Sequence, residues 1–352
     1  MDYAGLVPAA DFIPTQWGWL YFFLILTFIM HLLLMNVMLG GGIIALVKHI
    51  RQANAPCPVC RDISLKLPYK IAFTINFGVA PLLFLQVLYG NFIYVSSILM
   101  AVYWMGVLGL LLIFYYSAYI YDFKYEQWAG LKILFLALMV VFGLIIAFLF
   151  TNNMTLMLNP EKWTAYFENR SGTILNLSDP TLIPRYLHFV TASIAVAGLF
   201  MAVTWKFKQD PRAGEYIQEG LRWFSYATLV QIAIGLWFLI SLPQEIMLLL
   251  MGGSGLYTAV FLLGLAGVAM MLIFSFRGLV WSTVAGLMFT LVFMVLTRDL
   301  VRTAYLKDYF HPSELTVVPE YAPLFIFIAV LAGGLGTVFF MLKLAFEAGK
   351  EA

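Results

Sequence analysis

Charged residues are scarce in this sequence, in which Asp, Glu, Lys and Arg together make up 11% of 352 residues. A soluble globular domain carries about 25% charged residues, so this deficit excludes that class. The formal net charge is only +2 and there is no basic tract, which argues against a nucleic-acid partner. Hydrophobic residues, at 63%, instead predict a protein that crosses a membrane several times.

Cysteine is almost absent, because Cys57 and Cys60 in "APCPVCRD" are the only two. This pair excludes a scaffold of several disulfides, and Arg61 stands where covalent c-type haem attachment needs a histidine. A zinc site would need two further ligands, of which only His49 is close in sequence. The simplest interpretation is a plain cytoplasmic turn between prolines, with a redox or metal role left open.

A cleavable signal peptide is also missing, since "MDYAGLVPAADFIPTQ" contains no Lys or Arg. A span needs about 20 apolar residues, and no internal repeat or soluble domain interrupts the apolar runs. We therefore predict an all-α, polytopic transmembrane bundle that forms a single domain over residues 1–352. Nine spans are expected, at 17–47, 70–89, 96–120, 131–151, 183–205, 222–242, 255–274, 277–298 and 322–345.

The distribution of Lys and Arg predicts the orientation, because short cytoplasmic loops are enriched in both. Lysines and arginines crowd the segments after the first, third and fifth spans. This places the N-terminus outside and the C-terminus in the cytoplasm. The outer loops at 152–182 and 299–321 mix aromatics, charges and prolines, so we expect them to be ordered and to carry function.

Two histidines lie within predicted spans, His31 in "TFIMHLLLMNVMLGGG" and His188 in "RYLHFVTASIAVAGLF". A neutral imidazole is a common ligand of haem iron, whereas the alternative role is a hydrogen bond between helices. His31 lies about 14 residues into its span and His188 about 5, so their depths differ by roughly 13 Å, which favours two sites. Arg185 precedes His188 by three residues and either pairs with a haem propionate or snorkels to the interface.

Several motifs resemble subunit I of the cytochrome bd quinol oxidases, a family of nine-span haem proteins with the N-terminus outside. Thr27, His31 and Gly40 keep the family's spacing in the first span, and "INFGV" at 75–79 is similar to its second-span motif. "FTNNMTLMLNPEKW" is similar to the segment after the fourth span. The resemblance implies that His188 ligates the outer, quinol-side haem b and that His31 ligates another haem.

The departures from that family concern its oxygen chemistry. Val102 and Leu110 fall where the family has two glutamates, and Leu262 falls where it has a methionine ligand. The quinol-binding loop is shortened to "PQEIMLLLMGGSG", and the family's late Glu-x-x-Arg is matched only by Asp299 and Arg302. Because oxygen reduction requires a carboxylate relay to a buried iron, we do not expect an oxidase.

The sequence therefore predicts a haem b-binding membrane subunit of a respiratory electron-transfer complex in the cytoplasmic (inner) membrane of a bacterium or archaeon. It would pass electrons between the quinone pool and an outer c-type cytochrome or iron–sulfur subunit. We expect one or two haems; the residues assigned to them are His31 and His188 at the iron, with Arg185, Asp299 and Arg302 around the cofactor. Glu245 or His311 is expected at a quinone site.

Three other classes stay open for this sequence. A true cytochrome bd-type oxidase would show oxygen uptake with quinol. A haem-free membrane anchor or assembly subunit would be colourless, with both histidines hydrogen-bonded. A transporter is disfavoured because the spans hold few charged groups and no matched pair of broken helices.

Overall fold

The computed structural model describes residues 4–51, 57–127 and 131–351, and within these ranges helices dominate. The α-helices are α1 (Trp17–Arg51), α2 (Pro58–Leu99), α3 (Ala101–Phe123), α4 (Leu131–Met157), α5 (Leu182–Lys206), α6 (Ala213–Ser241), α7 (Gln244–Leu248), α8 (Gly255–Phe276), α9 (Val280–Leu306) and α10 (Ala322–Glu351). The shorter helical segments are η1 (Ala4–Leu6), η2 (Pro160–Phe167), η3 (Leu249–Gly253) and η4 (Pro312–Glu314). An isolated β-bridge joins Ile13 to Val317.

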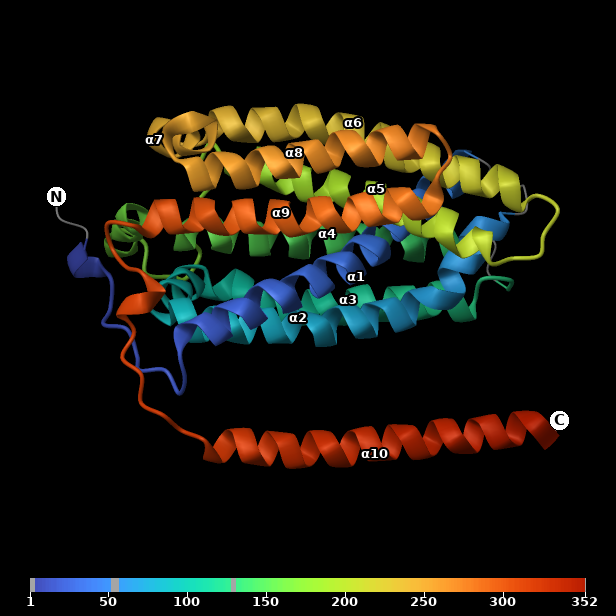
Figure 1. The fold of residues 1–352 in the computed structure, drawn as a ribbon, viewed down its shortest axis with the longest axis horizontal. Coiled ribbons are helices and arrows are strands. Elements are labelled where there is room, and N and C mark those ends of the chain that lie inside the picture. The colour runs from blue at the N-terminus through green and yellow to red at the C-terminus, as the bar shows by residue number, and fades with distance from the viewer. Residues whose placement is uncertain (1–3, 52–56, 128–130, 352) are drawn as a thin grey trace.

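Eight of the described helices, α1 to α6, α8 and α9, are long and apolar enough to cross a membrane. This confirms the predicted all-α, polytopic class. In lipid, a long apolar segment must satisfy its backbone hydrogen bonds internally, and a helix does so within the segment itself. The ninth predicted span corresponds to α10, whose apolar stretch at Ile328–Met341 is shorter. Figure 1 shows α10 running alongside the bundle and apart from it.

The turn predicted between the second and third spans is wrong. The chain is helical through residues 90–95, and Tyr89 only kinks α2, with φ −135° and ψ 32°. The reversal lies at Met100 instead, where the 172–174 segment pairs with both sides of the turn. Val102 N–H donates to the Gly172 carbonyl at 3.0 Å, and Ile174 N–H donates to the Leu99 carbonyl at 3.0 Å. A distant loop therefore sets this turn.

The two predicted outer loops are shorter than expected. Helix α4 continues to Met157, and η2 occupies part of the 158–181 connection. Helix α9 continues to Leu306, so Asp299 and Arg302 lie in a helix rather than in the predicted 299–321 loop. Both side chains are consequently buried in the bundle.

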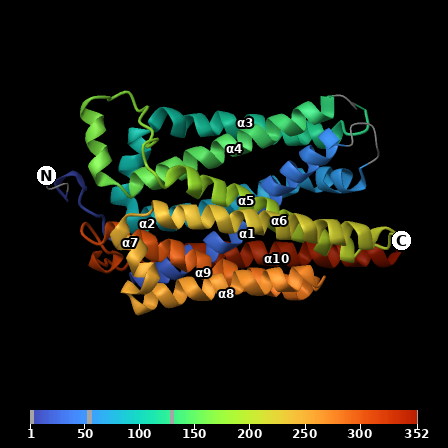
Figure 2. The same cartoon turned by 90° about the horizontal axis from the view of Figure 1, so that it is seen from above.

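Helix α5 packs closely against both α6 and α1. Figure 2 shows α5 running alongside α6. A Cβ atom added at Gly40 would lie 1.9 Å from the Ser193 carbonyl oxygen, so only glycine permits this approach of α1 to α5. On the other side of α5, a Cβ at Gly220 would lie 2.6 Å from the Gly198 carbonyl oxygen. These contacts fix the positions of the helices that carry His31 and His188.

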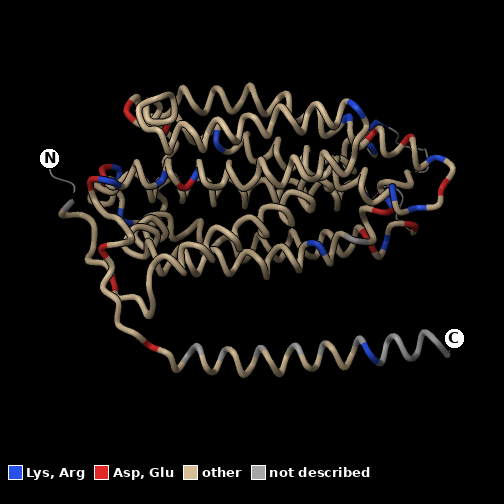
Figure 3. Tube along the Cα trace, in the orientation of Figure 1, with Lys and Arg blue, Asp and Glu red and all other residues tan. Residues whose placement is uncertain are grey.

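Charged residues gather at the two ends of the bundle, with few between them (Figure 3). We call the end that holds the N-terminal segment and residues 158–181 and 307–321 the amino end. The opposite end holds the start of α2, the 124–132 region and the 206–212 connection, and carries most of the 20 lysines and arginines. We call it the basic end.

A candidate cofactor site at the amino end

The His31 side chain lies between α1 and α2 and is fixed by a backbone carbonyl. Its Nδ1 atom lies 3.1 Å from the Thr74 carbonyl oxygen. Since a carbonyl only accepts, Nδ1 carries the proton and Nε2 keeps its lone pair. A Cβ at Gly78 would lie 2.8 Å from His31 Cε1, so this glycine makes room for the ring. An imidazole whose other nitrogen donates to a carbonyl has the arrangement common in metal-ligating histidines.

The His188 side chain lies between α5 and α6. The Gln231 amide nitrogen is 3.2 Å from His188 Nε2. The other ring nitrogen, Nδ1, is buried and has no hydrogen-bond partner among the described residues. Gly235 faces the same ring, since a Cβ there would lie 3.4 Å from His188 Cε1. The two histidines thus contact different neighbouring helices. Among the described residues, no hydrogen bond is found to His31 Nε2 or to His188 Nδ1.

Three arginines cluster near the start of α5 and the end of α9. Arg185 is buried, lies over the Phe238 ring at 5.0 Å, and has no partner for Nε or Nη2 within the described chain. Arg302 lies over the Tyr89 ring at 4.4 Å, and its Nε is likewise unpartnered. Arg298 lies over the Phe28 ring at 4.5 Å and within electrostatic reach of both other arginines. We call Arg185, Arg298 and Arg302 the arginine cluster.

The acidic side chains that offset this charge are few. Asp299 is buried, forms an ion pair with Arg302 one turn away, and accepts a hydrogen bond from the Tyr21 hydroxyl. Asp179 is within electrostatic reach of Arg185 but is already bonded to the Thr181 hydroxyl at 2.6 Å. Burying an unpaired charge costs about several kcal/mol, so unpaired buried arginines are expected only where they have a function. The arrangement therefore suits an anionic guest.

The quinone residues predicted from the sequence lie elsewhere at the amino end. Glu245 is exposed on α7, 3.5 Å from Lys307 Nζ. His311 caps η4, where its Nδ1 accepts from Ser313 N–H at 3.2 Å and its ring meets Trp17 edge-on. Neither residue contacts the arginine cluster through any interaction found in the described chain.

Two adjoining cavities open at the same end, with volumes of about 310 and 300 Å³. Asn91 and Leu315 line both of them. The larger cavity is also lined by Asp11 and Gln86, whereas Glu245 and His311 line neither. No sequence pattern indicates these cavities, because they form where the N-terminal segment meets α2 and the segment after α9.

Arg298, Tyr21 and Tyr89 also escaped prediction. Arg298 and Arg302 are four residues apart, a spacing that puts two residues on one helix face. That spacing is a usable signal for an arginine pair, but it applies only if residues 298–302 are helical, whereas the sequence predicts a loop over 299–321. Two positions where the family's ligand or relay residues were expected, Val102 and Leu262, are each 55% exposed and face away from the bundle.

No family model, curated protein or solved structure matches this chain. The described residues contain no group of three or more His, Cys, Asp or Glu side chains placed to hold a metal ion. A metal at His31 or His188 would therefore need a carrier that supplies most of its own ligands. The functional conclusion depends on the geometry of these two histidines and the arginine cluster.

Proposed function

We propose that this protein is a haem b-binding subunit of a membrane electron-transfer complex. The observation that carries the proposal is that two histidines lie within the bundle close to guanidinium nitrogens that have no partner in the described chain. Arg185 and His188 lie about one turn apart on α5. A haem presents one iron that needs axial nitrogen ligands and two carboxylates that need cations. It therefore complements both halves of this arrangement.

The residues present fit such a group. A porphyrin supplies four ligands to its iron, so a single histidine is enough to anchor it. His31 would ligate through Nε2. Because the Gln231 amide nitrogen donates to His188 Nε2, the proton of that ring lies on Nδ1, and His188 would ligate through Nε2 once the Gln231 amide turns away. The arginine cluster would hold the propionates. When bound, haem supplies reversible one-electron transfer.

The chain's own residues would orient and shield that group. The Thr74 carbonyl holds the proton on His31 Nδ1, and Asp299 together with the Tyr21 hydroxyl orients Arg302. An apolar cluster from α1, α5 and α9, which includes Phe28 and Phe189, excludes water between the helices. Such exclusion strengthens every charge interaction in the site.

The amino end is where we place the electron partners. The quinone ring would bind at the membrane interface, with Glu245 or His311 taking the quinol proton. A c-type cytochrome or iron–sulfur subunit would dock on the outer loops, through a contact that can be small for redox partners. This assignment places the amino end outside and the basic end in the cytoplasm of a bacterial or archaeal cell.

A haem-free membrane anchor is the second candidate, because one contact favours it. The Gln231 amide lies within hydrogen-bond distance of His188 Nε2. Polar pairs of this kind join transmembrane helices without any cofactor, at a gain of about 0.6 kcal/mol. In that case the partners of this chain would carry the redox chemistry.

A dithionite-reduced minus oxidised visible spectrum of the purified protein, with a haem-to-protein ratio, separates these candidates. We expect b-type bands that weaken separately in His31→Ala and His188→Ala and remain unchanged in His311→Ala, the matched surface control. A colourless protein would favour the anchor. A broad red band of haem d type together with quinol-dependent oxygen uptake would instead identify an oxidase.

A further inference from the structure

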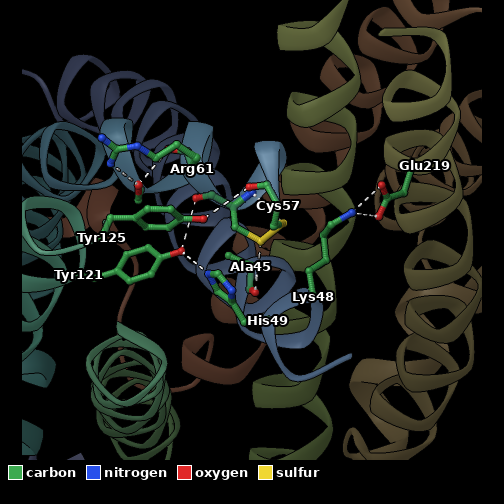
Figure 4. The surroundings of a disulfide bond; sticks show 10 residues. Ala45, Lys48, His49, Cys57, Arg61, Tyr121, Tyr125 and Glu219 are labelled. Atoms are coloured by element: carbon green, nitrogen blue, oxygen red, sulfur yellow. Dashed lines mark hydrogen bonds and ion pairs between the residues drawn. A yellow bond between two sulfur atoms is a disulfide. The ribbon is translucent and has the colours of Figure 1, made fainter. Parts of the chain in front are cut away.

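Cys57 and Cys60 form a disulfide at the first turn of α2, at the basic end (Figure 4). The bond joins residues only three positions apart. The stabilisation from a disulfide grows with the loop it closes, so this one constrains the unfolded chain very little. We therefore expect the Cys57–Cys60 disulfide to have a role other than stabilising the fold.

The two sulfur-bearing residues differ in accessibility. Cys60 is fully buried, whereas Cys57 is 7% exposed. In thiol–disulfide exchange the outcome depends on which sulfur the incoming thiolate can reach. Cys57 is therefore the more accessible residue of the pair, and Cys60 is the shielded one.

Both sulfurs have hydrogen-bond partners that suit the reduced pair. Cys57 is the N-cap of α2, and its Sγ accepts from Cys60 N–H at 3.2 Å. A thiolate at this position is stabilised by the helix N-terminus. The Ala45 carbonyl oxygen lies 3.8 Å from Cys60 Sγ and is placed to accept from a Cys60 thiol. Reduction therefore leaves neither sulfur without a partner.

The pair is tied to the ends of α1 and α3 by buried phenols (Figure 4). The Tyr121 hydroxyl donates to the Cys60 carbonyl at 3.4 Å and lies 3.0 Å from His49 Nε2. The Tyr125 hydroxyl donates to the Cys57 carbonyl at 3.5 Å. The backbone of the disulfide thus contacts side chains from α1 and from the end of α3.

The cellular compartment that the basic end faces also bears on the role of the disulfide, and this point rests on the orientation proposed above. The basic end faces the cytoplasm in that orientation. Disulfides are rare there, and those present in most organisms are catalytic or redox-sensing. We propose that Cys57 and Cys60 form a redox-active pair that exchanges electrons with a cytoplasmic dithiol protein.

The exchange balances as a two-electron step. A thiolate of the external dithiol attacks Cys57 Sγ, the Cys57–Cys60 bond breaks, and Cys60 leaves as a thiolate that takes a proton. The second thiol of the reductant then attacks the mixed disulfide and releases Cys57, which also takes a proton. The chain gains two electrons and two protons, and the dithiol becomes a disulfide.

The test uses the full-length protein in detergent and dithiothreitol as the probe. Samples are incubated with dithiothreitol without denaturant, quenched with acid, alkylated with a maleimide and weighed by mass spectrometry. We expect two alkylated cysteines after incubation and none after the reductant is removed and the protein is reoxidised with oxidised glutathione. A disulfide reduced only after denaturation, or thiols that no oxidant joins, would overturn the proposal. Neither result depends on haem content.

Two single variants test which sulfur is attacked. Cys60→Ser leaves only Cys57, and Cys57→Ser leaves only Cys60. Each variant therefore has a single thiol and is the control for the other. We expect the Cys60→Ser protein to form a mixed disulfide with an activated aromatic disulfide probe at least about tenfold faster, given the access and thiolate character of Cys57. Equal rates would contradict the assignment of Cys57, and the wild-type measurement stands even where a variant fails to fold.

Discussion

The two ends of the bundle treat buried polar groups in opposite ways. At the basic end, Lys48 Nζ lies 2.5 Å from Glu219 Oε1, and the His49 ring bonds the Tyr121 hydroxyl. The exception there is Trp205, whose indole nitrogen is buried without a partner. At the amino end, several nitrogens of Arg185 and His188 have no partner in the described chain.

This difference indicates which end of the bundle binds a ligand. A buried polar group left without a partner costs about 1–3 kcal/mol, so it is kept only where something else satisfies it. The network at the basic end supports the fold without a guest. The amino end contains donors and cations in excess, which is the arrangement expected of a binding site before its ligand is added.

The largest expected effect comes from removing the carboxylate of the arginine cluster. Asp299→Asn leaves the buried Arg302 guanidinium without its anion, and breaking a buried pair in this way costs about 3–5 kcal/mol. We expect a large fall in Tm in detergent. The matched change at the basic end is Glu219→Gln, which should cost less because Glu219 is 31% exposed and water can replace it. Equal losses at both ends would contradict the comparison.

Arg185→Leu separates a ligand site from a structural role. Losing one or two charge-assisted hydrogen bonds, each worth about 1.5–3 kcal/mol, should weaken haem binding by about tenfold or more. In haem-free protein the same change should leave Tm unchanged or raise it, because an unpartnered buried charge is removed. Arg170→Leu, an exposed arginine at the same end, is the control. A fall in Tm with haem content intact would show that Arg185 supports the fold instead.

Gly78→Ala tests whether the His31 ring packs closely against α2. The added methyl would lie 2.8 Å from His31 Cε1 and 3.0 Å from Nδ1, so the ring must shift and strain the bond to Thr74. Overpacking of this kind costs about 1–3 kcal/mol, and the b-type bands assigned to His31 should weaken. Gly109→Ala, where nothing lies within 4 Å of the new methyl, should be neutral or stabilising. Matching spectra and Tm values for the two variants would argue against close packing of the His31 ring on Gly78.

The smallest effect is expected at the surface of the basic end. Lys208 Nζ lies 2.8 Å from Asp62, with the lysine side chain 33% exposed. Lys208→Gln should cost about 0.2–1 kcal/mol, because solvent screens exposed pairs. The difference in Tm from wild type should shrink further at about 1 M salt, where the Debye length is about 3 Å. A loss comparable to that of Asp299→Asn would remove the distinction between the two ends.

Elements with a strong local signal were predictable. The break between α8 and α9 was expected between 274 and 277, and the helices end and begin at Phe276 and Val280. Gly278, with φ +74°, explains why this joint is encoded locally, since few other residues adopt that conformation. The turn at Met100 was not predictable, because its hydrogen bonds go to Gly172 and Ile174.

The candidate site was predictable only in part. His31 and His188 were identifiable because each is an isolated imidazole in an apolar run. The arginine cluster was not identifiable as a unit, because Arg185 lies on α5 and the other two arginines lie on α9. Sequence spacing relates residues within one helix and says nothing of which helices meet.

The sequence alone predicts an all-α membrane bundle, because continuous apolar runs of about 20 residues satisfy their backbone in lipid by forming helices. It also determined that two imidazoles lie within those helices. What surrounds them depends on the packing of the helices: α2 supplies the carbonyl that orients His31, and α5 and α9 bring three arginines together, one of which pairs with Asp299. The physical reason is that hydrophobic periodicity sets where a helix forms, whereas close contacts at residues such as Gly40 and Gly78 set which faces meet.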